Sequence, residues 1–318
     1  MKKVLALLFV LTLVISLFAS CAKEETSTEA ADEGKEDKIV IGMASNSFAD
    51  KWQTYLNDAV QAKCDELGIE VVFGDGKADA ATQLANVENF IVQGVDAVLI
   101  VMVDPAGPTP FINACKDAGI PLIAVNRMFE GAEVFVGSND INAGKMQMEF
   151  VAEALGNKGN IAILEGMSGQ NSAIKRTEGN TIVAETFPDI NIIRQDTGKW
   201  DRAKGMEIAE NWLQSGDQID AILANNDEMA IGAIRALEAA GKTDDIIVAG
   251  VDGTIDALGY VKEGTLAMTV FQSPFGQGGV AVESALKLID GEKLESYVDV
   301  PFEKVTIENV DEFIAIWE

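Results

Sequence analysis

Short apolar runs alternate with amphipathic stretches from Ile39 onward, and this alternation constrains the fold more than any other feature of the chain. Runs such as "IVIGMAS" and "VDAVLIV" are typical of buried strands. The stretches between them, for example residues 50–67 and 80–93, carry apolar residues at helical spacing and stop at Gly68 and Gly94. Such alternation predicts βαβ units and a parallel sheet covered by helices on both faces.

The same alternation starts again near residue 159, so the chain contains an internal duplication. Its clearest trace is the third strand of each half, which reads "GVDAVLIVMVD" in the first half and "QIDAILANNDE" in the second. The sequence therefore predicts an α/β fold made of two similar doubly wound, parallel-sheet lobes. If the first lobe has the strand order 2-1-3-4-5, Cys64 and Cys115 lie on opposite faces of its sheet and remain free thiols.

The first residues have the pattern of an export signal. Lys2 and Lys3 precede an almost wholly apolar run over residues 4–18, and Ala19 and Ser20 precede Cys21. Residues 1–20 are thus expected to be a signal peptide. "FASC" is similar to the bacterial lipobox, although Phe18 departs from the usual leucine, and this similarity implies that Cys21 is lipidated. Secretion without a lipid is one alternative, and a transmembrane anchor is another, although the run is short for a span.

The residues after Cys21 are polar, charged and free of aromatic side chains. The stretch "AKEETSTEAADEGKEDK" ends at Lys38, and with Cys21 it forms segment 21–38. Such a composition cannot bury enough apolar surface to fold. We therefore expect segment 21–38 to be a flexible tether between the lipidated cysteine and the folded body.

The chain contains no histidine, which excludes several kinds of active site. Ser-His-Asp and Cys-His catalysis, the commonest transition-metal ligand and the usual near-neutral proton shuttle are all missing. The formal net charge is −27, from 51 acidic and 24 basic residues. A surface of this charge repels phosphate backbones, so no nucleic-acid partner is expected, and the excess of acids also keeps a secreted protein soluble.

The sequence contains fragments of catalytic and nucleotide-binding motifs, but none of these motifs is complete. "AGKT" at 240–243 lacks the upstream glycine of a phosphate loop, because residue 236 is alanine. No G-x-G-x-x-G follows the first strand, and "GMSGQ" does not satisfy G-x-S-x-G. We therefore expect no cofactor and no enzymatic activity. An extracytoplasmic carbohydrate enzyme acting through Asp50 and Asp252 is kept as an alternative.

Polar side chains gather just past the ends of the expected strands, where ligands bind in doubly wound sheets. In the first half these residues are Asn46, Asp50, Asp104, Asn126 and Arg127. In the second half they are Gln170, Arg176, Trp200, Asn225, Asn226, Asp227 and Asp252.

Several motifs beyond Lys38 resemble those of one family of binding proteins. They are "QGVDAVLIVMVDP", "GIPLIAVNR", "LANNDEMAIGAIRALEAAGK", "VAGVDGTIDAL" and "TVFQ". Together with the export signal and the two lobes, they resemble the type I periplasmic sugar-binding proteins of ABC importers, in the ribose and galactose/glucose branch. Repressors of the lactose-repressor type share "NDEMAIGA" and "GVDG", but carry a DNA-binding helix-turn-helix where this chain has its export signal.

The resemblance implies sugar-binding roles for three polar residues. Asn226 and Asp252 match binding positions of both branches, and each can engage two hydroxyls. Arg176 matches the family's sugar-binding arginine, which is a multidentate donor. Structural roles are the alternatives, since Asn226 can cap a helix and Arg176 can form a surface ion pair.

Further matches concern the galactose/glucose branch. Trp52 and Trp200 match the two aromatic residues that sandwich the sugar, and Trp200 lies in a polar loop that is a poor place for a core residue. Asp50 matches that branch's carboxylate, although an acid there also favours a helix N-terminus. Gln272, in "TVFQ", matches an amide on a crossing strand.

Other positions depart from the galactose type. Gln170 and Ser172 replace its histidine and aspartate ahead of the arginine, and Val101 replaces an asparagine. The pair Asn126-Arg127 is closer to the Asp-Arg pair of the ribose and xylose types. The calcium loop of the galactose type has no counterpart at "ALGNKGNIA", so no structural metal is expected.

The resemblance as a whole implies a monomeric, lipid-anchored extracytoplasmic protein that captures a monosaccharide between hinged lobes and delivers it to an ABC permease. A pyranose such as galactose or glucose is favoured; ribose, xylose or inositol, and a receptor role in chemotaxis or signalling, are the alternatives. Three strands form the hinge, with crossings expected near 139–140, 271–273 and 301–303. The N-terminal lobe then comprises residues 39–140 and 273–302, and the C-terminal lobe comprises 141–271 and 303–318.

Overall fold

The computed structural model describes residues 38–317. The expected signal peptide, Cys21 and all of the expected tether except Lys38 lie outside the described residues. Among the described helices, none is both long enough and apolar enough to cross a membrane.

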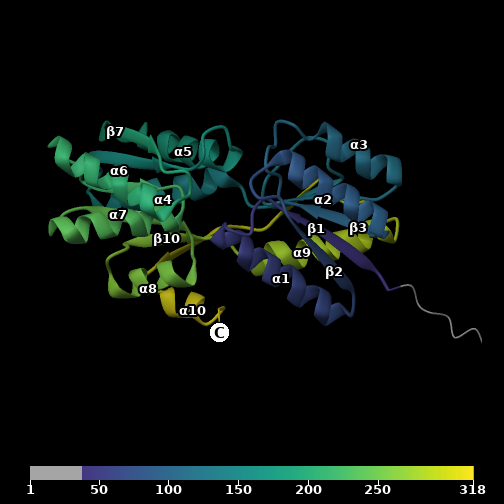
Figure 1. Cartoon of the computed structure of the whole chain (residues 1–318). Coiled ribbons are helices and arrows are strands. Elements are labelled where there is room, and N and C mark those ends of the chain that lie inside the picture. Colours follow the sequence, from purple (N-terminus) through teal and green to yellow (C-terminus); the bar gives the residue numbers. More distant parts are fainter. Residues whose placement is uncertain (1–37, 318) are drawn as a thin grey trace, which may run out of the picture. The chain divides into compact units, whose positions relative to one another are not determined.

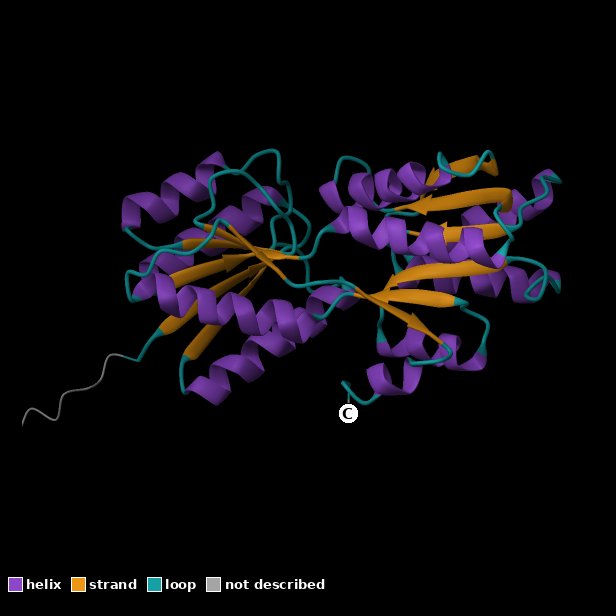
Figure 2. Cartoon of the chain, turned by 180° about the vertical axis from the view of Figure 1, so that it is seen from behind, coloured by secondary structure: helices purple, strands orange, loops and turns teal. Residues whose placement is uncertain are grey.

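The first sheet contains six parallel strands in the order β11-β5-β4-β3-β1-β2. We call this sheet and the helices that cover it the first lobe (Figures 1 and 2). Its strands are β1 (Val40–Ser45), β2 (Glu70–Asp75), β3 (Ala97–Ile100), β4 (Leu122–Val125), β5 (Val134–Gly137) and β11 (Tyr297–Asp299). Its helices are α1 (Lys51–Leu67), α2 (Ala80–Gln93), α3 (Thr109–Ala118) and α9 (Pro274–Ile289).

The second sheet repeats this order as β12-β10-β9-β8-β6-β7, and with its helices it forms the second lobe. Its strands are β6 (Lys158–Glu165), β7 (Asp189–Thr197), β8 (Ala221–Ala224), β9 (Ile247–Asp252), β10 (Met268–Phe271) and β12 (Glu303–Thr306). Its helices are α4 (Asp140–Ala154), α5 (Asn171–Ala184), α6 (Arg202–Ser215), α7 (Asp227–Ala240), α8 (Ile255–Glu263) and α10 (Val310–Ile314). The predicted pair of doubly wound α/β lobes is confirmed.

One strand departs from the predicted parallel pattern. β12 runs antiparallel to β10, with Met268 opposite Thr306. The chain reaches β12 from β11 through residues 300–302 alone. β11 runs parallel to β5 and so ends at the carboxyl edge of the first sheet. The carboxyl end of β10 also leads into a crossing, so the chain enters the second sheet at its carboxyl edge and β12 runs opposite to β10.

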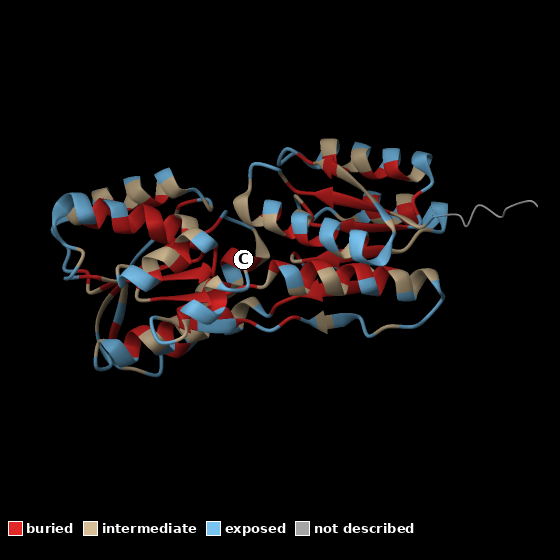
Figure 3. Ribbon diagram, turned by 90° about the horizontal axis from the view of Figure 1, so that it is seen from below, coloured by how far each residue is buried: buried red, intermediate tan, exposed pale blue. Residues whose placement is uncertain are grey.

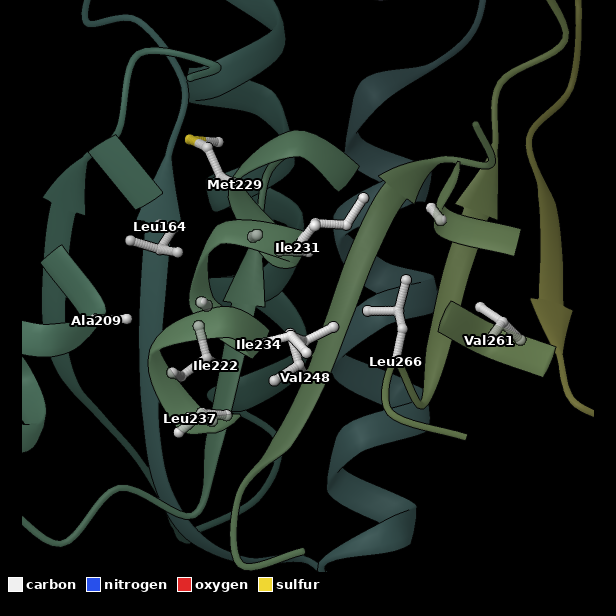
Figure 4. Close-up of a cluster of buried hydrophobic side chains, with 14 of the residues drawn as sticks. Leu164, Ala209, Ile222, Met229, Ile231, Ile234, Leu237, Val248, Val261 and Leu266 are labelled. Carbon is white, nitrogen blue, oxygen red and sulfur yellow. The ribbon is translucent and has the colours of Figure 1, made fainter. Parts of the chain in front are cut away.

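Buried side chains lie on both faces of each sheet, as Figure 3 shows for the strands and the inward sides of the helices. In the first lobe, α1 and α9 pack against one face and α2 and α3 against the other. Cys64 and Cys115 belong to these two different clusters and are buried free thiols, as predicted. In the second lobe, α6, α7 and α8 cover one face, where Ile231, Ile234 and Leu237 of α7 meet Ile222 and Val248 (Figure 4).

Side-chain caps fix where the site's helices begin. Asp50 caps α1 by accepting a hydrogen bond from the Gln53 amide, and Asn226 caps α7 by accepting one from the Met229 amide. Glycines in the left-handed conformation end α1, α2 and α7, as expected for Gly68 and Gly94, and Gly241 ends α7 in the same way.

The chain passes between the lobes three times. β5 leads through residues 138–139 into α4, β10 leads through 272–273 into α9, and β11 leads through 300–302 into β12. Two of these crossings are bonded to each other, because Ser138 Oγ donates to the Val300 carbonyl at 2.5 Å. Gln277 Nε2 of α9 donates to Ser138 Oγ at 3.0 Å.

The C-terminal residues add a further contact between the lobes. α10 packs in the second lobe, where Phe313 meets Phe271 at a ring-centroid distance of 5.1 Å. Trp317 then lies against two rings of the first lobe, Tyr55 at 4.4 Å and Phe275 at 5.2 Å, both edge to face.

Candidate ligand-binding cleft

A cavity of about 390 Å³, called the cleft below, lies at the carboxyl ends of the strands between the two lobes. In the first lobe the loops after β1 and β4 and the start of α1 line it, and in the second lobe the segments after β6, β7, β8 and β9 and the crossing residue Gln272 line it. The structure brings all eleven predicted ligand-binding residues to this one cleft: Asn46, Asp50, Trp52, Asn126, Arg127, Gln170, Arg176, Trp200, Asn226, Asp252 and Gln272. Asp104 does not line the cleft; its Oδ1 instead accepts a hydrogen bond from the Ala106 amide at 3.0 Å.

Arg176 is the most highly connected of these side chains, and only 4% of it is exposed. Its Nε donates to Asp140 Oδ1 at 2.8 Å, and Nη2 donates to Gln272 Oε1 at 2.9 Å. Its Nη1 donates hydrogen bonds to the Asn225 carbonyl at 2.7 Å and to Asp252 Oδ1 at 3.4 Å. The surface ion pair considered from the sequence is therefore wrong, because this guanidinium is buried and joins α4, β8, β9 and the second crossing.

Close helix packing places Arg176 beside Asp140. A Cβ added to Gly144 of α4 would lie 1.9 Å from the Arg176 carbonyl, so α4 and α5 touch through their backbones there. Burial by itself lowers the pKa of Arg176, but Asp140 and Asp252 outweigh it and raise that pKa above its ordinary value. The guanidinium therefore stays charged inside the cleft wall.

Asp252 holds an unusual backbone conformation at the end of β9. Its φ is 128°, and Gly253 follows with φ 66°. Burial raises the pKa of Asp252, which Arg176 opposes and the neighbouring Asp227 reinforces. A non-glycine residue at such a φ costs on the order of 1–3 kcal/mol and persists only where its surroundings fix it.

Asp227 provides that support from behind the cleft wall. It is fully buried, and its carboxylate accepts hydrogen bonds from Thr254 N at 2.9 Å and Thr269 Oγ1 at 2.6 Å. Burial raises its pKa to about 7, against hydrogen bonds that lower it. Its place just past a strand end was predicted, and it lies in the first turn of α7, but its bonds to β10 and to the loop after β9 were not predicted.

The two asparagines before α7 have different roles. Asn226 lines the cleft while its Oδ1 caps α7, and its Nδ2 donates to the Trp200 carbonyl at 3.4 Å. Asn225, which the sequence left without a role, is fully buried. Its Oδ1 accepts from Gly166 N at 3.0 Å, and its carbonyl accepts from Arg176. Asn225 thus joins the loop after β6 to the arginine.

Trp200 is held in the cleft by its neighbours and by its own backbone. Its φ of 67° lies in the left-handed region, and Nε1 donates to Gln170 Oε1 at 2.7 Å. A Cβ on Gly166 would lie 2.1 Å from the indole ring, so only glycine fits there. The guanidinium of Arg176 lies 5.8 Å from the ring centroid.

Three residues of the first lobe contribute at and near the start of α1. Trp52 Nε1 donates to the Gln272 carbonyl at 3.2 Å. Asp50 caps α1 and also lines the cleft, so the helix cap considered from the sequence is present and sugar binding by this carboxylate stays a prediction. Asn46 Oδ1 is buried and makes no hydrogen bond within residues 38–317. This oxygen is an acceptor that a ligand hydroxyl can satisfy.

Asn126 and Arg127 follow β4. Asn126 has φ 62°, and its Nδ2 donates to Gln277 Oε1 at 3.3 Å. Arg127 is buried and donates through Nη1 to the Met102 carbonyl at 3.0 Å. Burial lowers the pKa of Arg127, while Asp50 and Asp140 oppose this effect.

Four charged residues at one rim of the cleft were not predicted, and we call them the rim cluster: Lys51, Arg202, Glu228 and Asp256. Lys51 Nζ of the first lobe lies 2.6 Å from Asp256 Oδ2 of the second. Arg202 donates to both Glu228 carboxylate oxygens at 2.8 Å. Glu228 and Asp256 lie in the first turns of helices, where acids are common. The four residues start helices that are far apart in the sequence, so the sequence did not show that they come together.

Comparison with known proteins identifies the family. Residues 41–293 match the family model described as a periplasmic binding protein domain. The chain belongs to this family. The fold, the site at the strand ends and the match together confirm the resemblance to type I periplasmic binding proteins stated from the sequence.

Individual relatives of this periplasmic binding protein cover almost its whole length. A crystal structure of an ABC transporter solute-binding protein from Bacillus halodurans C-125 with bound myo-inositol is 46% identical, has a TM-score of 0.84, and covers 89% of this chain and 99% of its own. A putative rhizopine-binding protein of Rhizobium meliloti is 36% identical over 86% of this chain and 92% of its own. The ribose import binding protein of Bacillus subtilis is 30% identical over 96% and 99%.

Acidic residues are numerous in this periplasmic binding protein, but their arrangement does not suggest a metal centre. Within residues 38–317, no group of three or more histidine, cysteine, aspartate or glutamate side chains is placed to hold a metal ion. The acidic side chains in and behind the cleft wall instead form ion pairs with arginines, cap helices or accept hydrogen bonds from backbone amides.

Proposed function

We propose that this protein captures a six-membered polyol ring in the cleft and delivers it to an ABC permease. The observation that carries the proposal is the convergence of side chains from both lobes on one cavity. A ligand held from both sides binds the closed arrangement better than the open one, so it selects closure. Closure also excludes water and strengthens the hydrogen bonds made inside.

The polar groups of the cleft suit a ring bearing hydroxyls around its edge. Asn46 Oδ1 and the carboxylate of Asp252 are acceptors for hydroxyl hydrogens. The guanidinium of Arg176 and the Nδ2 atom of Asn226 are donors at the wall of the second lobe. Such an arrangement favours ligands in which one atom can both donate and accept hydrogen bonds, as the oxygen of a hydroxyl can.

The two tryptophans suit the C–H faces of such a ring. Trp52 comes from the first lobe and Trp200 from the second, and the indole nitrogen of each is bonded to protein. Their rings therefore meet the ligand through carbon atoms only. Six-membered rings with flat C–H faces gain most from this contact.

Among six-membered rings we place myo-inositol ahead of galactose and glucose. The resemblance described from the sequence favours galactose or glucose and has inositol among its alternatives. The relative solved with bound myo-inositol shares 46% identity with this chain, which supports the cyclitol. Ribose follows, on the basis of the ribose import relative.

We also propose that the protein acts outside the cytoplasm, held to the membrane by a lipid on Cys21, as a monomer without cofactor or catalytic activity. The export signal, the family and the absence of histidine from the sequence support this part. A receptor role in chemotaxis or signalling would use the same cleft. Loss of uptake after deletion of the gene supports transport, and loss of a ligand response with normal uptake supports the receptor role.

Calorimetric titration against myo-inositol, galactose, glucose, xylose and ribose tests the ligand. A ligand at a hundredfold excess over its Kd stabilises the folded state by about 2.7 kcal/mol, so a parallel thermal-shift measurement must show the same ranking. Failure of every ring polyol to bind would refute the proposal. Recovery of chemically changed ligand after long incubation would refute the absence of catalysis.

A further inference from the structure

A second cavity of about 190 Å³ lies next to the cleft, and the function proposed above does not use it. We call it the side chamber. Asn126 of the first lobe and Ser172 of the second line both cavities, so the side chamber adjoins the cleft at these two side chains. Its other lining residues include Met128, Phe135, Asp140, Lys175 and Tyr297.

The side chamber offers no free charge. Asp140 is bonded to Arg176 at 2.8 Å, and Lys175 is paired with Glu178 at 2.6 Å. Part of its wall in the first lobe is apolar, where Phe135 and Tyr297 stack with ring centroids 5.4 Å apart and planes 9° from parallel. Met128 completes this wall and is 45% exposed. An uncharged group with apolar surface fits these surroundings better than an ion.

Ser172 and Asn126, which line both cavities, each carry an oxygen atom that makes no hydrogen bond within residues 38–317. The Ser172 hydroxyl makes no hydrogen bond within residues 38–317, although only 8% of the residue is exposed. Asn126 donates through Nδ2 to Gln277, and its Oδ1 accepts no hydrogen bond from any described residue. A hydroxyl can donate to an ether oxygen, and an amide oxygen can accept from a neighbouring hydroxyl. An alkoxy group beside a free hydroxyl presents this pattern.

We propose that the side chamber is a subsite for an uncharged substituent on the ring, so that the ligand class includes O-alkylated ring polyols. The inference rests on the proposed function, because the ring itself must occupy the cleft. The ring lies between Trp52 and Trp200, and its substituent passes between Asn126 and Ser172 into the chamber. The smaller volume of the chamber limits the substituent to a group smaller than the ring.

Matched ligand pairs test the subsite by calorimetry. The pairs are myo-inositol with its mono-O-methyl ethers and galactose with its methyl galactosides. We expect at least one ether to bind the natural protein as tightly as its parent ring or more tightly. In Met128→Trp, whose larger side chain occupies the chamber, that ether should bind about tenfold more weakly while the parent stays within about twofold.

Val92→Trp is the control for adding a tryptophan, because Val92 is 86% exposed on α2 and lines neither cavity. It should bind parent and ether as the natural protein does. The subsite is overturned if every ether binds more weakly than its parent, if the tightly binding ether binds Met128→Trp as tightly as the natural protein, or if that variant weakens both ligands alike. If neither the parent rings nor ribose binds, the proposed function fails, and the subsite fails with it.

Discussion

Replacing Lys51 by methionine should weaken ligand binding, because Lys51 joins the two lobes at the mouth of the cleft. Its ammonium nitrogen lies 2.6 Å from Asp256 and 3.9 Å from Glu228, both in the second lobe. The pair forms only when the lobes are close together, so it stabilises the arrangement that the ligand also favours. Methionine keeps much of the side chain's length and apolar surface while removing its charge.

The magnitude follows from the exposure of the pair. The side chains of Lys51 and Asp256 are 36% and 40% exposed, so solvent screens their attraction and the pair contributes about 0.2–1 kcal/mol. That range corresponds to a loss of about 1.4- to 5-fold in affinity. Arg202 holds Asp256 in place at 3.1 Å, which reduces the entropy cost of the pair and favours the upper part of the range.

Calorimetric titration at low and high salt measures the effect. The affinity ratio of the natural protein to Lys51→Met should fall towards one near 1 M salt, where the screening length is about 3 Å. Lys204→Met is the matched control, because Lys204 pairs with Glu207 at 2.6 Å within α6 and crosses no lobe boundary. Asp256→Asn and the double variant complete a cycle that isolates the coupling between the two residues.

Two results would refute this reasoning. Equal affinities for the natural protein and Lys51→Met at low salt would mean that the pair does not contribute to closure. An equal loss in Lys204→Met would mean that the effect comes from net charge rather than from contact between the lobes.

Three further predictions concern the cleft wall. Trp200→Ala should lower affinity by about tenfold or more in calorimetry, since aromatic stacking adds about 0.5–1.5 kcal/mol to the area that the ring buries; unchanged affinity would exclude stacking. Gly166→Ala should also lower affinity while circular dichroism stays unchanged, because its Cβ would displace the Trp200 ring. Burial raises the pKa of Asp227 to about 7 from an ordinary 3.8, so the folded state keeps a proton that the unfolded state releases between these values. The carboxyl therefore makes the protein less stable as pH rises from about 4 to 7, and Asp227→Asn should reduce that slope in urea unfolding at stepped pH, whereas an identical slope would contradict the assignment.

The fold could be read from the sequence because its signals are local. Strands such as 97–100 are continuous apolar runs, and glycines such as Gly68 stop the helices where the sequence suggested. The direction of β12 could not be read in this way. The resemblance placed residues 303–318 in the C-terminal lobe, but the direction depends on pairing with β10, and no local pattern specifies a partner strand so distant in sequence.

The candidate site also contains some residues that could be predicted from the sequence and others that could not. Residues facing the cleft follow strand ends, so their positions could be predicted. The residues behind them could not, because their roles depend on contacts between elements. Asn225 joins β8 to the loop after β6 and to Arg176, and Asp227 reaches Thr254 and β10. Asparagine is a common helix cap and aspartate is common in the first turn of a helix. The sequence therefore does not distinguish Asn225 and Asp227 from residues that have only those ordinary roles.

The position of Trp317 has a practical consequence for work with this protein. Its ring lies against Tyr55 and Phe275, although the helix that precedes it packs in the other lobe. Trp317 is therefore a residue of one lobe whose ring contacts the other, so a change in the spacing of the lobes changes the surroundings of this indole. Its fluorescence is an intrinsic reporter of closure that needs no added label. A bulky tag attached next to Trp317 would disturb the same contacts and alter the affinity being measured.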